Sequence, residues 1–222
     1  MKKENRFKEM VLYIEACESG SMFRNVLPND MNIFVTTAAS FNESSYACYL
    51  DETRNTYLGD CYSVNWMEDT DKEDIVRETL YDQFLLVKKE TNESHVKSFG
   101  DMKIARLPVA DFQGEGPATK ILYPKAPRSP VPSHDVPLQL LIAQLSKYNH
   151  AEIVAKYKSL IKKRRYLDKI MKHVVRQIAD NDQRAEDWLM RRSVDKFENL
   201  DCFTDIVHSY SKHCFNLGRV DR

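Results

Sequence analysis

The sequence predicts an α/β domain followed by an α-helical region, and three features of the chain support this prediction. Residues 11–14 and residues 33–39 are short apolar runs that end in polar loops, a pattern typical of strands buried in a parallel sheet. Residues 112–133 hold more than half of the chain's eight prolines, which is typical of a linker. From Asp135 onward, apolar residues recur at helical spacing.

The two expected strands should bring their following loops together at one edge of the sheet. Cys17 and Gly20 follow the first run, and the second run passes through Thr37. In open α/β sheets, binding sites form just outside the carboxyl ends of the strands. We therefore expect the loops after residues 14 and 37 to face one pocket, with Cys17 at its side.

Two further elements are expected before the linker, and a bundle of helices after it. Thr70 and Glu73 have the spacing of a capping box, and apolar residues at helical spacing follow up to Val87, which predicts an amphipathic helix. Residues 102–109 are predicted to form a strand. The helical region has its apolar positions at Leu141, Leu145, Tyr148, Ile153, Tyr157, Leu160, Ile161, Leu167, Ile170, Met171, Val174, Val175 and Ile178.

The composition excludes several classes of protein. With 42% hydrophobic and 30% charged residues, the 222-residue chain has the composition of a globular protein that can bury a core. No apolar run approaches the roughly 18 residues that a membrane-spanning helix needs, so we expect no membrane partner. The five cysteines form no Cys-x-x-Cys pair and have no metal-ligand spacing, so we expect no metal and no other cofactor. An odd number of cysteines leaves at least one free thiol.

Charge is divided unequally along the chain. Residues 1–149 carry 17 Lys and Arg against 22 Asp and Glu, a net charge of −5, whereas residues 150–222 carry 16 against 11, a net charge of +5. Two such regions attract one another, and the attraction weakens when acid protonates carboxylates. The basic run at residues 162–165 raises nucleic-acid binding as an alternative. Because the run lies inside a helical pattern, a solvated helix face explains it, and we expect no nucleic-acid partner.

Several segments resemble one protease family. Residues 13–22, Tyr-Ile-Glu-Ala-Cys-Glu-Ser-Gly-Ser-Met, resemble the nucleophile segment of the legumain family of asparaginyl endopeptidases, which have a caspase-like fold. Residues 43–48 resemble the segment that lines the specificity pocket of that family, and residues 57–69 resemble the stretch after it. The transamidase that attaches lipid anchors, from the same clan, fits less well, because Glu15, Glu18 and the helical region match legumain.

The resemblance extends to the second half of the chain and sets the domain bounds. Residues 135–138 resemble the start of the activation region, and residues 213–216 resemble part of the C-terminal prodomain. The implied organisation is the C-terminal part of a caspase-like peptidase domain at residues 1–112, a proline-rich linker and activation region at 113–149, and a helical prodomain at 150–222. The first strands of a caspase-like sheet are then missing from the chain.

The resemblance assigns roles to individual residues. Cys17 is the implied nucleophile, and Ser19 and Gly20 form the turn that exposes its sulfur and aims backbone N–H groups at a substrate oxygen. The residues implied to line the pocket for an Asn side chain are Glu15, Ser44 and Asp60. The implied function is cleavage after Asn, and less readily after Asp, through a thioester with Cys17.

The resemblance also implies processing sites, partners and a compartment. Asn149 lies where the family removes its propeptide autocatalytically, and that prodomain would block the active site. Asn92 and Asn42 both begin glycosylation sequons, of which Asn92 is the better placed. Peptides with Asn before the scissile bond and cystatin-type inhibitors are the other implied partners. The lysosome or vacuole, or secretion, is the expected location.

The catalytic histidine is not found where the resemblance requires it. In the related caspase arrangement the histidine precedes the cysteine by roughly 50 residues, whereas none of the 16 residues before Cys17 is His. We therefore expect a chain truncated at both ends and inactive alone. The cysteines Cys202 and Cys214 either pair with each other or have partners elsewhere. The competing hypothesis is a pseudoenzyme that keeps the pocket as an interaction surface.

Overall fold

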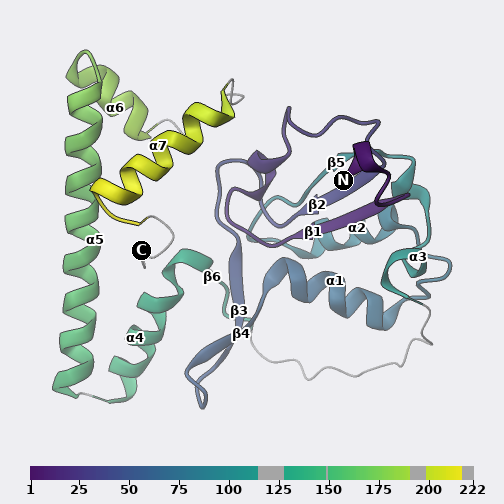
Figure 1. Ribbon diagram of the computed structural model, residues 1–222. Coiled ribbons are helices and arrows are strands. Elements are labelled where there is room, and N and C mark those ends of the chain that lie inside the picture. Colours follow the sequence, from purple (N-terminus) through teal and green to yellow (C-terminus); the bar gives the residue numbers. More distant parts are fainter. Residues whose placement is uncertain (115–127, 149, 191–198, 217–222) are drawn as a thin grey trace. The chain divides into compact units, whose positions relative to one another are not determined.

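The computed structural model describes residues 1–114, 128–148, 150–190 and 199–216. Contacts between residues divide the chain into two units, Met1–Ser133 and His134–Arg222. The first unit contains both sheets, and its strands and helices are labelled in Figure 1. The second unit is built from helices alone within the described residues.

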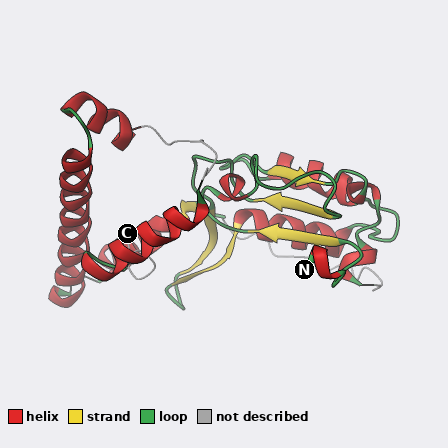
Figure 2. Cartoon of the chain, turned by 45° about the horizontal axis from the view of Figure 1, so that its top comes forward, coloured by secondary structure: helices red, strands yellow, loops and turns green. Residues whose placement is uncertain are grey.

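The first sheet contains three strands in the order β1 (Met10–Ile14), β2 (Ile33–Thr37) and β5 (Lys97–Gly100). Strands β1 and β2 are parallel, as predicted, and their register places Ile14 opposite Thr37. Their carboxyl ends therefore lie at one edge of the sheet. Strand β5, which the sequence analysis missed, pairs with β2 in the antiparallel direction, so the sheet is mixed (Figure 2).

The second sheet is antiparallel and was not predicted. It contains β4 (Thr56–Asp60), β3 (Tyr46–Asp51) and β6 (Val131–Pro132), in that order. β3 and β4 form a hairpin. β6 comes from the end of the proline-rich segment and pairs with the start of β3, at Tyr46 and Ala47. The second sheet thus begins directly after the loop that follows β2.

Two helices pack against the first sheet and bury its apolar side chains. Helix α1 (Cys61–Lys72) and helix α2 (Leu80–Glu90) contribute Tyr62, Phe84 and Val87 to a cluster that also contains Ala38 and Val96. A second cluster gathers Phe34 of β2 and residues around the short helix α3 (Ala110–Gln113). The remaining helical segments of this unit are the 3₁₀ turns η1 (Lys2–Glu4), η2 (Ser19–Met22) and η3 (Ile104–Arg106).

The predicted start of the amphipathic helix is wrong. Thr70 lies inside α1, where its hydroxyl donates to the Trp66 carbonyl oxygen at 2.8 Å instead of capping a new helix. The capping box belongs to α2, where the Thr79 hydroxyl accepts from the Asp82 N–H at 3.1 Å and the Asp82 carboxylate accepts in return from the Thr79 backbone. Helix α2 then carries the predicted apolar residues from Leu80 to Val87.

The predicted strand at residues 102–109 is also wrong. A turn follows β5, in which the Asp101 carboxylate accepts from the Lys103 N–H at 2.9 Å, and the 3₁₀ turn η3 comes next. Ile104 and Ala105 are both buried. Two adjacent buried side chains fit one turn of helix and conflict with the alternation of a strand that has one buried face.

The second unit consists of α4 (Val136–Lys147), α5 (Ala151–Ile178), α6 (Asp182–Met190) and α7 (Leu200–His213), preceded by the 3₁₀ turn η4 (Ser133–Asp135). The predicted helical region is therefore confirmed. Asp135 and Arg164 form an ion pair at 2.6 Å that ties the start of α4 to α5. No helix among the described residues is long and apolar enough to cross a membrane.

Candidate active site

The nucleophile candidate, Cys17, lies in the loop after β1. The chain turns sharply there, because Glu18 adopts a left-handed backbone conformation with φ of 52° before η2 begins. The Cys17 side chain is half-buried. Its Sγ lies 3.1 Å from the Ser44 hydroxyl and 3.6 Å from the Ser45 hydroxyl. The structure thus brings Cys17 together with the predicted pocket residue Ser44.

Ser19 and Gly20 fasten the Cys17 loop to the loop after β2. The buried Ser19 hydroxyl accepts from the Ala39 N–H at 3.1 Å and donates to the Ala39 carbonyl oxygen at 3.3 Å. The Gly20 N–H donates to the same carbonyl at 3.1 Å. The two loops therefore meet, as the parallel pairing predicts. Because the Gly20 N–H is hydrogen-bonded to Ala39, the structure supports its place in the turn, while its oxyanion role stays a prediction.

Gly20 is required by this close approach of two backbones. A Cβ at this position would lie 3.1 Å from the Ala39 carbonyl oxygen and 3.3 Å from the Phe41 nitrogen. We expect Gly20→Ala to destabilise the chain by about 1 kcal/mol, since overpacking forces backbone to move. Denaturant unfolding measures the change. The exposed neighbour Ser21 provides the control, and equal stability of Gly20→Ala and Ser21→Ala would contradict the assignment.

Glu43 joins the Cys17 loop to the pocket segment. Its Oε1 accepts from the Ser40 N–H at 2.6 Å and from the His95 N–H at 2.8 Å, and its Oε2 lies 2.7 Å from His95 Nδ1. Its backbone carbonyl accepts from the Glu18 N–H at 2.8 Å. Although burial acts to raise the pKa of Glu43, hydrogen bonds from His95 and Ser40 hold that pKa below its ordinary value. Glu43 was not predicted to matter, and its acidic side chain next to Ser44 was the available signal.

Glu15 and Asp60 place two acidic groups near each other. The Glu15 Oε2 accepts from the Ser63 N–H at 2.9 Å, and burial, together with the charge of Asp60, raises the pKa of Glu15 to about 7. Burial also raises the pKa of Asp60. Within the described residues, the Glu15 Oε1 is buried without a hydrogen-bond partner. Glu15 therefore holds a proton through the acidic range, and one of its buried oxygens is left unpaired among the described residues.

Two serines connect Cys17 with Asp60, and neither was predicted. The Ser45 hydroxyl lies 3.1 Å from the Ser133 hydroxyl, which donates to Asp60 Oδ1 at 3.3 Å. The Ser133 N–H also donates to the Ser45 carbonyl at 2.9 Å. Because Ser133 follows β6, the end of the proline-rich segment lies beside Ser45 and Asp60. No pattern in the sequence indicated this contact, since β6 and β3 are far apart along the chain.

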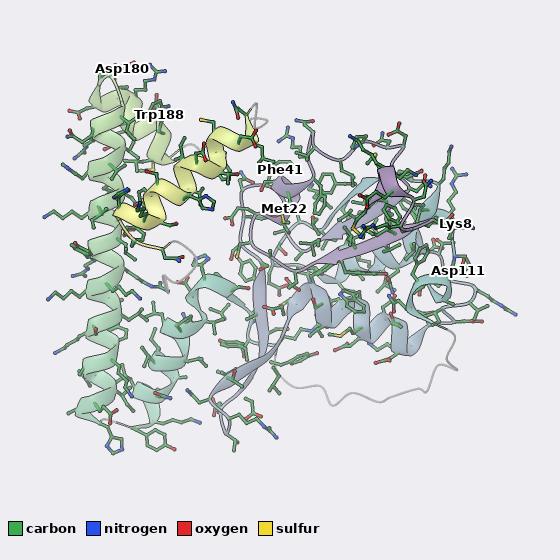
Figure 3. The ribbon with its side chains drawn as sticks, viewed as in Figure 1. Lys8, Met22, Phe41, Asp111, Asp180 and Trp188 are labelled. Atoms are coloured by element: carbon green, nitrogen blue, oxygen red, sulfur yellow. The ribbon has the colours of Figure 1, made fainter. Side chains whose placement is uncertain are left out.

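A side-chain contact also links the loops after β1 and β2. Figure 3 labels Met22 and Phe41, which lie on these neighbouring loops. The Arg24 guanidinium lies 4.2 Å from the centre of the Phe41 ring. Met22 is 54% exposed. An apolar side chain on the loop that follows β1 is thus exposed to solvent.

The remaining predicted sites fall into separate places. Asn149 lies outside the described residues. Asn92 is exposed directly after α2, and Ser94 of its sequon is buried and donates to the Ala38 carbonyl at 2.6 Å. Cys202 and Cys214 are exposed free thiols. No group of three or more His, Cys, Asp or Glu suited to a metal ion occurs in the part of the chain that the structure describes.

Comparison with known proteins identifies related sequences. The sequence model of the Peptidase C13 family matches residues 1–115. Legumain of Rattus norvegicus is 42% identical over 227 residues, which cover 99% of this chain and 52% of that protein. Legumain of Homo sapiens is 40% identical over 223 residues, which cover 97% of this chain and 51% of that protein. Hemoglobinase of Schistosoma japonicum is 35% identical over 227 residues, which cover 99% of this chain and 52% of that protein. The chain spans about half the length of these curated relatives.

Proposed function

The chain belongs to the Peptidase C13 family, and from this premise we propose that it carries the nucleophile and specificity pocket of a cysteine endopeptidase that cleaves after Asn. The observation that supports the proposal most is the position of Cys17. Its half-buried thiol lies at the carboxyl end of β1, 3.1 Å from Ser44, in the segment that the family model matches.

The proposed reaction is acyl transfer through Cys17. The Cys17 thiolate attacks the peptide carbonyl carbon, a carbon–sulfur bond forms, the carbon–nitrogen bond breaks, and the amine leaves with a proton. Water then hydrolyses the thioester and restores the thiol. This chemistry needs an imidazole that removes and returns the proton. His95 is hydrogen-bonded to Glu43 and is not hydrogen-bonded to Cys17, so we assign it to loop support. We propose that the activating imidazole is not among the described residues, and that the 222-residue chain alone is inactive.

Glu15 and Asp60 together have the chemistry to select a carboxamide. An Asn side chain presents one acceptor and two donors. Glu15 is protonated when the pH is below its pKa of about 7, and it can then donate to the amide oxygen. A carboxylate oxygen of Asp60 can accept from the amide nitrogen. A substrate without these groups would leave buried polar atoms unpaired, which costs binding energy. An Asp side chain has the same shape and can donate only when protonated, so cleavage after Asp should need acid.

The region after the linker is proposed to inhibit the site. The proposal is supported by the segment that leads into this region, because β6 pairs with β3 and Ser133 contacts Ser45 and Asp60. The opposite net charges of residues 1–149 and 150–222 provide an attraction that acid weakens. We further propose cleavage at Asn149, a glycan at Asn92, inhibition by cystatin-type proteins and a lysosomal or vacuolar location, all by likeness to the family.

A second candidate function is a protein without catalysis that binds partners through the same pocket. The observation that favours it is that, among the described residues, the hydrogen bonds of the Cys17 sulfur go to two serines and to no imidazole. Activity measurements separate the two candidates.

Pocket specificity can be tested in a chimera in which this chain replaces the aligned half of rat legumain. We expect Asp60→Asn to lower kcat/KM for an Ala-Ala-Asn reporter peptide by about 10- to 100-fold, because an uncharged side chain accepts more weakly from the substrate amide. The matched control is Asp30→Asn, on an exposed loop. An unchanged preference for Asn over Ala in the Asp60 variant would exclude Asp60 from the pocket.

A further inference from the structure

Two of the five cysteines lie together beside the proposed pocket. Cys48 belongs to β3 and lies opposite Gly59 of β4, while Cys61 begins α1 directly after Asp60. Their exposed fractions are 0% and 1%. They form one buried cluster with Val64, against which Tyr46 and Tyr49 pack. The hairpin and the helix start therefore place both thiols in the same apolar space.

The two thiols are hydrogen-bonded to each other and differ in acidity. This hydrogen bond lowers the pKa of Cys48 against the effect of burial, and the positive charge of Arg128 adds to the lowering. The same hydrogen bond, together with burial, raises the pKa of Cys61. Cys48 is thus the better nucleophile, and Cys61 is the thiol that donates.

We propose that Cys48 and Cys61 form a reversible disulfide that fastens β3 to the start of α1, with a small-molecule disulfide such as oxidised glutathione as the oxidant. Both side chains lie in the same buried cluster, and a disulfide needs its sulfurs about 2.05 Å apart, so rotation of the side chains has to close the remaining distance. The proposal is independent of the peptidase activity.

The exchange takes place in two steps that balance. Cys48 loses its proton, its thiolate attacks one sulfur of oxidised glutathione, and one glutathione leaves as a thiolate. Cys61 then loses its proton and attacks the Cys48 sulfur of the mixed disulfide, and the second glutathione leaves. Two protein thiols are oxidised, and one glutathione disulfide is reduced to two thiols. Because both sulfurs are buried, the first step requires a transient separation of β3 from α1.

The site lies where a covalent link would affect the pocket. Ser45 is three residues before Cys48, and Asp60 immediately precedes Cys61. The disulfide therefore fixes the pocket segment relative to Asp60, whereas the reduced pair leaves the two held by non-covalent contacts. Cys17, in contrast, is hydrogen-bonded to serines and has no thiol partner among the described residues.

The test uses the 222-residue chain with Cys17→Ser, Cys202→Ser and Cys214→Ser, which leaves only this pair. The chain is equilibrated with reduced and oxidised glutathione, in buffer and in urea, and is quenched with acid, alkylated and weighed. We expect a form that takes up no alkyl group and is two hydrogen atoms lighter than the unalkylated reduced chain. We also expect an equilibrium constant at least about tenfold larger in buffer than in urea, because the fold holds the thiols together. An equal or smaller constant in buffer, or a glutathione adduct without the internal disulfide, would overturn the proposal.

Two further measurements keep the result interpretable. Cys61→Val preserves an apolar side chain and should abolish both the mass change and any oxidation-dependent rise in thermal midpoint. If the triple variant does not fold, the unaltered chain is oxidised and digested with trypsin. Arg54 lies between the two cysteines, so the peptides that contain them separate unless the disulfide joins them. Recovery of only separate peptides from the oxidised, folded chain would also contradict the proposal.

Discussion

Replacing Cys17 with alanine in the rat legumain chimera should lower kcat/KM for the Ala-Ala-Asn reporter by at least about 10³-fold, since removal of a nucleophile eliminates covalent catalysis. The loss should appear in kcat, because Cys17 reacts with the substrate and contributes little to holding it. Cleavage of the fluorogenic peptide measures both constants, and alkylation of the thiol reports that the site is accessible.

The control for this experiment is Cys202→Ala, which removes an exposed thiol from the second unit and should leave the rate unchanged. An active chimera that tolerates Cys17→Ala would contradict the assignment of the nucleophile. If the chimera with Cys17 intact is inactive while rat legumain is active in the same assay, the result would favour the hypothesis of a binding protein without catalysis. Cleavage by the 222-residue chain alone, abolished by Cys17→Ala, would contradict its expected inactivity.

The first unit should lose stability as the pH rises from 5 to 8, by on the order of 3 kcal/mol. The main cause is an acidic pair, the buried Asp69 near the end of α1 and the half-buried Glu78 before α2. Burial raises the pKa of Asp69 to about 6. Burial, with the charge of Asp69 added, raises the pKa of Glu78 to about 8. Within the described residues, both carboxylate oxygens of Asp69 are buried without a hydrogen-bond partner.

The direction of this effect follows from proton binding. A carboxyl whose pKa is higher in the folded chain than its ordinary value of 4.5 or 3.8 binds more protons when folded. The stabilising contribution of such a carboxyl is fully present when the pH is below its ordinary pKa. It is lost as the pH rises through the pKa of the folded chain. The other charges acting on the pair, Glu73, Asp82 and Glu90, are acidic and add to the shift. Since Glu78 is only partly buried, solvent screening reduces its share.

Glu78→Gln is the variant that tests the acidic pair. It removes the titrating group and keeps its shape, so we expect the unfolding free energy at pH 8 to rise towards its value at pH 5. Urea unfolding at several pH values measures the slope. Glu52→Gln, on the exposed turn of the β3–β4 hairpin, is the control. A wild-type chain whose stability does not fall above pH 6 would contradict the role of the pair. Glu15, with its pKa raised to about 7, contributes in the same direction.

The sequence predicted the part of the fold that local patterns encode. The two apolar runs became parallel neighbours, and Cys17 lies at the carboxyl end of the first, because continuous apolar runs are typical of strands covered on both faces. The start of the amphipathic helix was predicted at Thr70 because Thr70 and Glu73 have the spacing of a capping box. In the structure α1 continues through Thr70. The box that begins α2 uses Asp82 in place of the usual Glu or Gln.

Long-range pairing explains the elements that were missed. β5 is only four residues long, and its place depends on the register with β2, which no local pattern contains. The same is true of β6, and thus of the contact between Ser133 and Ser45. The roles of Cys17 and Ser44 came from family resemblance, and the structure adds their contact. Glu43 was not predicted because two of its three side-chain hydrogen bonds join it to His95, which only the fold brings close.

The pairing of β6 with β3 has a consequence for dilution. Because β6 belongs to the same chain as β3, its contact with Ser45 is governed by an effective concentration within the chain and not by the protein concentration. Lowering the protein concentration therefore leaves this contact in place. If a peptide bond between β3 and β6 is cut and the pieces separate, β6 binds β3 as a separate ligand. The fraction of β3 that is paired with β6 then falls when the sample is diluted.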